Sequence, residues 1–234
     1  MTFRGLALAT LAAATALTGC ADDGSSVALV PSSMTGIVGE IDLALESETD
    51  WVIAGSSRLV AQLADGAEAE ILITADAITM DDAAARGLVA GEPVVFAGNR
   101  LVVALAPGNP GEVAHLSDLN RGDLLIGVCA PEVPCGRLAA EAADALDLDL
   151  SIDTEEPNVR SLANKVASGE LDAGLIYATD AADLELETLD TNALAPFVTS
   201  YLVVSVDGET STIADFLVSP AGQALLATQG FSRP

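Results

Sequence analysis

Short apolar segments alternate with amphipathic segments along most of this chain, and that alternation limits the folds it can adopt. Apolar runs occur at 27–30, 51–54, 70–74, 100–106, 124–128, 173–177 and 201–206. Between them, apolar residues recur with helical spacing, as in the series Met34, Ile37, Val38, Ile41 and Leu45. Strands separated by helices are typical of an α/β protein with a mostly parallel sheet. The alternation therefore predicts an α/β fold.

The helices expected between and after these strands begin at recognisable residues. Their ranges are 34–45, 56–64, 76–86, 136–146, 158–166, 212–217 and 220–228. Asp76 and Asn158 are good helix-capping residues, and Pro220 suits the first turn of the last helix. The capping residues therefore support the helical ranges that the apolar spacing predicts.

The first twenty residues have the pattern of an export signal. Arg4 precedes an apolar stretch at 5–17, which is too short to span a bilayer in the mature protein. The stretch ends in LTGC at 17–20, which resembles a bacterial lipobox. We expect 1–19 to be a lipoprotein signal peptide, Cys20 to be lipidated and 20–26 to be a polar tether. The protein would then lie on the extracytoplasmic face of the membrane, held by lipid. An ordinary signal peptide with an incidental cysteine is the alternative.

The charge balance excludes several classes of partner. The chain has 9 Lys and Arg against 35 Asp and Glu, a formal net charge of −26, and its only lysine is Lys165. Nucleic-acid binding needs clustered basic residues, and an interfacial helix on an anionic membrane needs a basic face. Half of the residues are apolar, so a large core is expected.

Two cysteines remain after Cys20. Cys129 and Cys135 enclose the sequence CAPEVPC, and thiols outside the cell tend to pair, so we favour a disulfide between them. A free buried cysteine and a metal site are the alternatives. A metal site lacks ligands, because His115 is the only histidine. We therefore expect no bound metal ion.

Four of the expected helices begin directly after small or capping residues, at 32–33, 55–57, 134–136 and 157–159. The first turn of a helix has unpaired N–H groups and a partial positive charge, which bind anions. In an α/β sheet these helix starts gather at the carboxyl ends of the strands. The pattern predicts an anion site, with plain helix capping as the alternative.

Three basic residues follow these helix starts closely. Arg58, Arg137 and Arg160 stand in the first helical turns, where a positive charge opposes the helix dipole. On a chain of strongly negative charge, such residues would help an anion to approach. We expect them to attract the anion rather than to hold it.

The order of short motifs resembles the molybdate-binding proteins of ABC transporters, from Val27 to Pro234. The motifs are PSSMT at 31–35, GSSRL at 55–59, DGAEAEILITAD at 65–76, NRLV at 99–102, PEVPCG at 131–136, NVR at 158–160, GLIYATD at 174–180 and GF at 230–231. The resemblance implies a type II periplasmic-binding-protein fold, with two α/β lobes, a ligand cleft and two crossover segments. Lobe one would hold 27–104 and 201–234, and lobe two 105–200, with crossings near 104–107 and 196–201.

The same resemblance implies a set of ligand-binding residues. Ser33 and Ser56 would donate through hydroxyl and backbone N–H groups, Cys135 and Val159 through backbone N–H groups, and Tyr177 through its hydroxyl. These neutral donors would hold a tetrahedral oxyanion between the lobes.

The sequence departs from the family pattern at two places. The turn that is Pro-Ala-Gly in the family is PCG at 134–136, and Glu70 stands where the family commonly has Asp. A disulfide between Cys129 and Cys135 would lie at the binding turn, so its reduction would loosen that turn.

The resemblance implies a monomeric solute-binding lipoprotein that captures molybdate or tungstate for import through an ABC permease, without a cofactor. Sulfate, phosphate or another small oxyanion is the alternative ligand. A secreted serine hydrolase is disfavoured, because the chain has no G-x-S-x-G motif and His115 is its only candidate base. We therefore expect no enzymatic activity. The third class of function is a lipoprotein whose role is only adhesive or structural.

Overall fold

The computed structural model describes residues 26–234, so the expected signal peptide, the lipidation site Cys20 and almost all of the tether lie outside the described residues. Eight strands form one sheet in the order β2-β1-β3-β8-β4-β7-β5-β6. The strands are β1 (Ser26–Pro31), β2 (Thr49–Ala54), β3 (Ile71–Thr74), β4 (Val94–Leu105), β5 (Ile126–Cys129), β6 (Ile152–Glu156), β7 (Ala173–Tyr177) and β8 (Val198–Ser205).

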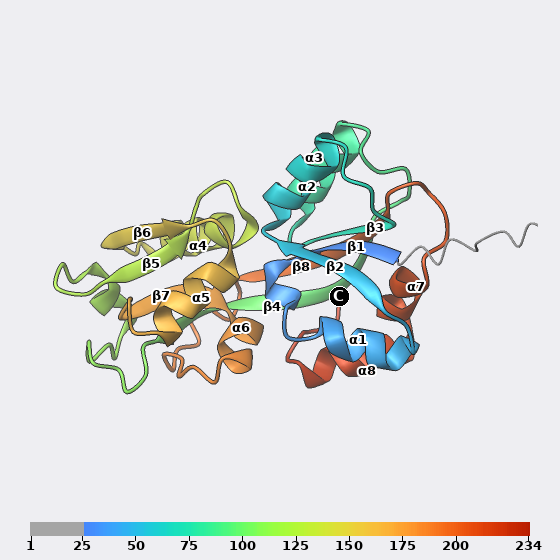
Figure 1. Ribbon diagram of the computed structural model, residues 1–234. Coiled ribbons are helices and arrows are strands. Elements are labelled where there is room, and N and C mark those ends of the chain that lie inside the picture. The colour runs from blue at the N-terminus through green and yellow to red at the C-terminus, as the bar shows by residue number, and fades with distance from the viewer. Residues whose placement is uncertain (1–25) are drawn as a thin grey trace, which may run out of the picture.

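Helices cover both ends of this sheet (Figure 1). They are α1 (Val38–Leu45), α2 (Ser56–Ala64), α3 (Ala77–Ala85), α4 (Pro134–Leu146), α5 (Val159–Ala167), α6 (Ala178–Asp183), α7 (Thr212–Val218) and α8 (Pro220–Thr228). Two short 3-10 helices are η1 (Ser32–Met34) and η2 (Leu116–Asn120). Among the described residues, we find no helix with the length and apolar character needed to cross a bilayer.

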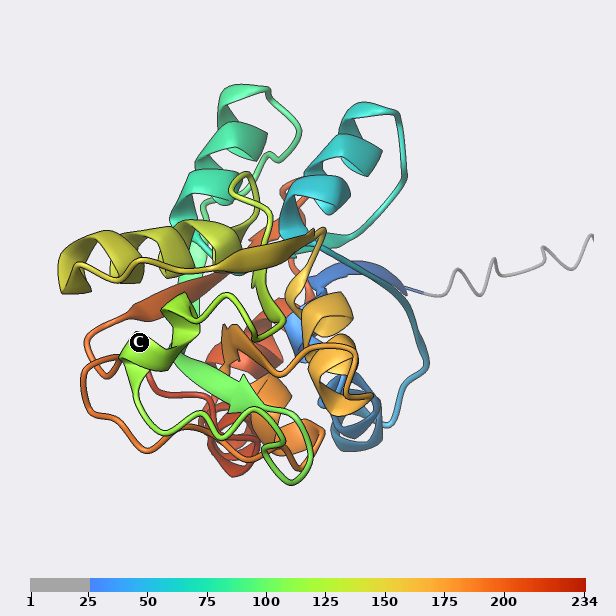
Figure 2. The same cartoon turned by 90° about the vertical axis from the view of Figure 1, so that its left-hand side faces the viewer.

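The sheet divides into two halves that share the long strand β4 (Figure 1). Figure 2 looks at the molecule from the side of the second half, with the first half behind it. The first half contains β1–β3 and β8 with α1–α3, α7 and α8, and the second half contains β5–β7 with α4–α6. Residues 94–100 of β4 pair with β8, whereas 101–105 pair with β7. The chain therefore passes from one half to the other along β4 and returns before β8. The expected lobe limits, 27–104 with 201–234 and 105–200, remain a prediction.

The sheet is mixed rather than mostly parallel. The pairs β1–β2, β1–β3, β5–β6 and β5–β7 are parallel, as strand–helix alternation predicts. The central pairs β3–β8, β8–β4 and β4–β7 are antiparallel. The reason is that β4 carries the chain out of the first half, whereas β8 starts after the return and leads back into the first half, so the two strands run in opposite directions.

Local sequence signals explain most helix starts. The Asp76 carboxylate accepts a hydrogen bond of 2.9 Å from the Thr79 N–H, and the Asn158 amide oxygen accepts one of 2.9 Å from the Ser161 N–H. Pro220 stands in the first turn of α8. These expected capping roles are confirmed.

Four elements differ from the sequence-based expectation. Strand β4 starts at Val94, six residues before the expected start at Arg100. The range 34–45 is not one helix: Met34 belongs to η1, 35–37 form a turn, and α1 starts at Val38. Strand β6 was not expected, because its sequence IDTEE is polar and only Glu156 is buried. Helix α6 was also not expected, because it follows β7 without an intervening loop.

An aromatic cluster packs where the two halves meet. The Tyr201 ring on β8 lies edge-on to Phe96 of β4 at 6.3 Å, to Tyr177 of β7 at 6.3 Å and to Phe231 at 5.3 Å. Tyr201, Tyr177 and Phe96 are the largest fully buried side chains. Because they come from both halves, their packing places the end of β7 next to the strands of the first half.

Candidate functional site

A small cavity lies between the two halves of the molecule, with a volume of about 10 Å³. The first half lines it with Pro31, Ser32, Ser33, Gly55, Ser56 and Ala75, and the second half with Val133, Pro134, Cys135, Asn158, Val159 and Tyr177. The five residues expected to bind an oxyanion all line this cavity. A cavity of this size holds no more than about one water molecule, so a larger guest would need the two halves to move apart.

Four helix starts surround the cavity. Ser33 lies in η1, Ser56 is the first residue of α2, Cys135 lies in the first turn of α4, and Val159 is the first residue of α5. First-turn N–H groups have no partner within their own helix, and the helix dipole adds a partial positive charge there. The structure therefore brings the four helix starts singled out in the sequence to one place.

The Ser56 hydroxyl is arranged to donate into the cavity. Its side chain is buried, and its Oγ accepts a hydrogen bond of 3.1 Å from the Ala75 N–H, at the end of β3. A hydroxyl has one hydrogen to donate in addition to its acceptor capacity. The contact with Ala75 uses the Ser56 oxygen only as an acceptor, so the hydroxyl hydrogen would be available to a guest.

The Ser33 hydroxyl is held in the same way by a longer chain of hydrogen bonds. The Tyr201 hydroxyl donates to Ser33 Oγ, and the Asn99 amide donates to the Tyr201 oxygen at 3.3 Å and to Thr179 Oγ1 at 2.7 Å. Burial raises the pKa of Tyr201, so its hydroxyl keeps the proton that it donates. Sequence reasoning missed Tyr201, Asn99 and Thr179, because they lie far from Ser33 along the chain.

Tyr177 supplies a buried donor that the protein does not use. It ends β7, only 1% of its surface is exposed, and its hydroxyl makes no hydrogen bond of good geometry within residues 26–234. Its polar neighbour is the Thr199 hydroxyl, which donates its own hydrogen to the Ala75 carbonyl oxygen. Burial raises the pKa of this hydroxyl well above its ordinary value, so it stays a neutral donor. An unpaired buried hydroxyl costs free energy, and an acceptor in the cavity would remove that cost.

None of the described residues that line the cavity carries a formal charge. Its polar groups are hydroxyl and backbone N–H donors, together with the Asn158 amide, whose oxygen already caps α5. Such a site suits a guest whose outer atoms all accept hydrogen bonds.

Cys129 and Cys135 are joined by a disulfide in the structure, with Cα atoms 5.6 Å apart, which is a usual separation for a disulfide. The bond closes the turn between β5 and α4, next to the Cys135 N–H. A Cβ on Gly136 would lie 1.9 Å from the Ala130 carbonyl oxygen, so this turn is tightly packed. Formation of the disulfide in the exported protein remains a prediction.

The three arginines expected to attract an anion have different environments. Arg58 is exposed. Arg137 forms an ion pair with Asp76, and Arg160 forms one with Asp183. Because paired carboxylates compensate two of the three charges, the attraction expected from Arg137 and Arg160 is weakened.

Asp180 is a buried carboxyl group that sequence reasoning missed. It lies in α6, only 1% exposed, and neither carboxyl oxygen has a hydrogen-bond partner in the described part of the chain. Burial raises its pKa to about 8, Asp183 adds to the shift and Arg160 opposes it. Asp180 and Ser33 line a second small cavity, adjacent to the first through that serine.

Comparison with known proteins identifies the family. Residues 31–232 match the model of the family described as bacterial extracellular solute-binding protein. The chain belongs to this family. This solute-binding protein is 36% identical over 192 residues to the molybdate-binding protein ModA of Mycobacterium tuberculosis, covering 79% of this chain and 74% of that protein. It is 28% identical over 259 residues to ModA of Escherichia coli, covering 98% of this chain and 96% of the relative.

Solved structures confirm the fold of this solute-binding protein. The periplasmic molybdate-binding protein of Azotobacter vinelandii aligns with a TM-score of 0.74 at 17% identity, over 90% of this chain and 100% of that one. The sulfate-binding protein SubI of Mycobacterium tuberculosis aligns with a TM-score of 0.69 at 16% identity, over 89% and 87%. The expected family and the expected periplasmic-binding-protein fold are therefore confirmed.

Proposed function

We propose that this solute-binding protein captures molybdate or tungstate outside the cytoplasm and delivers it to the permease of an ABC transporter. The observation that carries the proposal is the buried Tyr177 hydroxyl, which lacks a partner in residues 26–234 and lines a cavity of neutral donors. The 36% identity to a protein named molybdate-binding protein supports the choice of ligand.

Ser33, Ser56, Cys135, Val159 and Tyr177 would hold the oxyanion together. Ser33 and Ser56 come from the first half and the other three from the second, so all five donors meet only when the halves are closed. Hydrogen bonds to an anion are about twice as strong as those between neutral groups. Several such bonds in a site closed to water offset the desolvation of a dianion. A site built from neutral donors also avoids an uncompensated buried charge when it is empty.

Phosphate fits this cavity less well than molybdate does. At neutral pH phosphate carries a P–OH group, whose hydrogen needs an acceptor. The described lining residues include no carboxylate, which would be the strongest acceptor for that hydrogen. Sulfate is the second candidate, because it is also a tetrahedral dianion that only accepts, and because the fold aligns with a sulfate-binding protein.

Calorimetry with molybdate, tungstate, sulfate and phosphate tests the proposal. We expect molybdate and tungstate to bind tightly, sulfate to bind much more weakly, and phosphate to give no measurable heat. Sulfate binding as tight as molybdate binding would move the assignment to sulfate. A protein that binds none of the four anions would contradict the proposal.

The protein acts outside the cytoplasm, as its family indicates. We propose in addition that Cys20 carries the lipid anchor. In a bacterial host, Cys20→Ser should move the protein from the membrane fraction to the soluble fraction and abolish labelling with a radioactive fatty acid. Cys129→Ser serves as the control, because it removes a cysteine outside the lipobox-like sequence. Unchanged membrane association of Cys20→Ser would contradict the anchor.

A further inference from the structure

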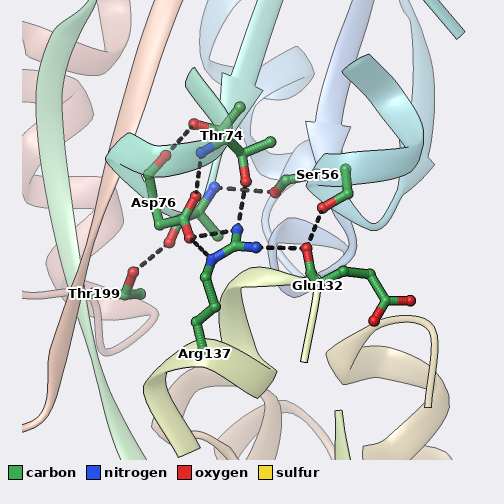
Figure 3. Close-up of polar contacts among 9 residues, drawn as sticks. Ser56, Thr74, Asp76, Glu132, Arg137 and Thr199 are labelled. Atoms are coloured by element: carbon green, nitrogen blue, oxygen red, sulfur yellow. Dashed lines mark hydrogen bonds and ion pairs between the residues drawn. The ribbon is translucent and has the colours of Figure 1, made fainter. Parts of the chain in front are cut away.

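An ion pair joins the two halves beside the cavity (Figure 3). Arg137 lies on α4 in the second half, and Asp76 caps α3 in the first half. The guanidinium donates from Nε at 2.8 Å and from Nη2 at 2.6 Å to Asp76 Oδ2, and from Nη2 at 2.7 Å to Thr79 Oγ1. The Arg137 side chain is 25% exposed and that of Asp76 is 14% exposed, so water screens the pair only partly.

A second contact between the halves lies next to this ion pair. The Ser57 hydroxyl on α2 donates at 2.9 Å to the Glu132 carbonyl oxygen, in the turn between β5 and α4. Arg137 Nη1 donates to the same carbonyl oxygen. Figure 3 shows the Arg137 guanidinium between the Asp76 carboxylate and the Glu132 carbonyl. Arg137 therefore holds both the first half and the turn that presents the Cys135 N–H.

The ion pair is also connected to the Ser56 donor. Asp76 follows Ala75, whose N–H donates to Ser56 Oγ at 3.1 Å and whose carbonyl accepts from Thr199 Oγ1. Thr74 Oγ1 donates at 2.7 Å to the Asp76 carbonyl oxygen. The ion pair between Arg137 and Asp76 thus constrains the chain segment that orients the Ser56 hydroxyl.

We propose that Arg137 is a positioning residue for oxyanion binding. Its ion pair with Asp76, called the clasp below, keeps the two halves closed over the guest and slows release of the guest. The inference rests on the proposed function. The clasp joins groups from different halves, so opening the cavity must break it. It forms only when the halves meet, after the anion has entered. It therefore acts on the dissociation rate and leaves the association rate unchanged.

Two substitutions break the clasp with little other damage. Asp76→Asn removes the charge, and its side-chain oxygen still caps α3, since Asn is as good a capping residue as Asp. Arg137→Gln removes the guanidinium on the opposite side. The matched control is Arg86→Gln, which breaks the exposed pair with Asp82 within the first half, at the far end of α3.

Stopped-flow displacement of bound molybdate measures the release rate, and calorimetry gives the affinity. We expect each substitution to speed release about 5- to 150-fold, the usual range for a coupling between sites. The association rate should stay within twofold of wild type, Arg86→Gln should release at the wild-type rate, and Arg137→Lys should recover part of the loss. The double variant should release no faster than the worse single variant, because both substitutions remove the same clasp.

Release from both single variants at the wild-type rate would overturn the clasp. So would fully additive effects in the double variant, or an association rate that falls as far as the release rate rises. Failure of the proposed function has a different signature, a wild-type protein that binds neither molybdate nor tungstate, and that result would overturn both.

Discussion

At the scale of the residue, the site is defined by the hydroxyl groups that are left to donate a hydrogen bond to a guest. Ser33 and Ser56 accept hydrogen bonds from the protein, so their own hydrogens are free for a guest. The Tyr177 hydroxyl makes no hydrogen bond of good geometry within the described residues. Three hydroxyl groups, from η1, α2 and β7, thus line one cavity. A bound guest would supply the acceptors for their hydrogens.

Tyr177→Phe should weaken molybdate binding about 10- to 100-fold, because it removes one hydrogen bond to an anion. The ring stays, so its packing against Tyr201 is kept. The unliganded variant should be at least as stable as wild type, since a buried hydroxyl without a partner is removed. Calorimetry and thermal unfolding measure the two effects. Affinity equal to that of wild type would take Tyr177 out of the site.

Asp180 predicts a pH dependence of stability. Burial raises its pKa from 3.8 to about 8 in the folded protein. The folded state then binds this proton more strongly than the unfolded state, so the contribution of Asp180 to the free energy of unfolding is greatest below pH 3.8 and is lost as pH rises to about 8. Arg160 and Asp183 face this carboxyl group from α5 and α6, and Tyr177 and Tyr201 lie near it.

Asp180→Asn tests this dependence, because the amide does not titrate. The variant should be more stable than wild type at pH 8, by several kcal/mol at most, and the difference should shrink steadily towards pH 4. Urea unfolding across this range measures it. Two parallel stability profiles would show that Asp180 does not titrate as proposed.

At the scale of the element, helix starts and strand ends create the cavity. Strand β1 is followed directly by η1, and β2 is followed by Gly55 and α2. Strand β7 ends at Tyr177 and is followed directly by α6. Gly55 shows how closely the two halves approach: a Cβ there would lie 2.8 Å from the Pro157 carbonyl oxygen, just before α5. Its φ of −64° is ordinary, so the need for glycine comes from this contact and not from backbone strain.

Gly55→Ala should therefore hinder closure without damaging either half. We expect molybdate affinity to fall about 10-fold or more, because overpacking typically costs about 1–3 kcal/mol and here the cost falls on the closed form. The melting temperature of the unliganded protein should change little. Gly39→Ala is the control, since a Cβ at Gly39 meets nothing within 4 Å. Equal affinities for the two variants would contradict this role of Gly55.

At the scale of the whole molecule, charge opposes the proposed ligand. The net charge of −26 repels a dianion at long range, so association should become faster as salt screens this repulsion. Arg58 is exposed near the start of α2, whereas Arg137 and Arg160 are paired. The arginine that can aid the approach of the anion is therefore Arg58.

Arg58→Gln should slow molybdate association two- to fivefold at low salt and have little effect near 0.5 M salt, where the Debye length is only about 4 Å. Stopped-flow association at several ionic strengths measures this. Arg86→Gln makes the same change in net charge at the far end of α3, and it should slow association less. An equal effect of the two substitutions would mean that net charge alone, and not the position of Arg58, matters.

The strands and helices with strong local signals could be predicted from the sequence, and the elements without them could not. Asp76, Asn158 and Pro220 mark their helix starts through contacts within one turn. Strand β6 has a polar sequence and depends on pairing with β5, and the antiparallel centre of the sheet depends on how the chain returns between the halves. The five cavity residues were expected from helix starts together with the family resemblance.

The sequence by itself determined the local features that have strong signals: most of the strands, the helix starts marked by a capping residue or proline, and which of those starts offer free N–H groups. Only the tertiary structure decided which groups meet. Tyr201 reaches Ser33 across 168 residues of chain, and Arg137 reaches Asp76 across 61. The physical reason is that capping and periodicity act within a few residues, whereas burial, ion pairing and the direction of a hydroxyl hydrogen depend on neighbours that only folding brings together.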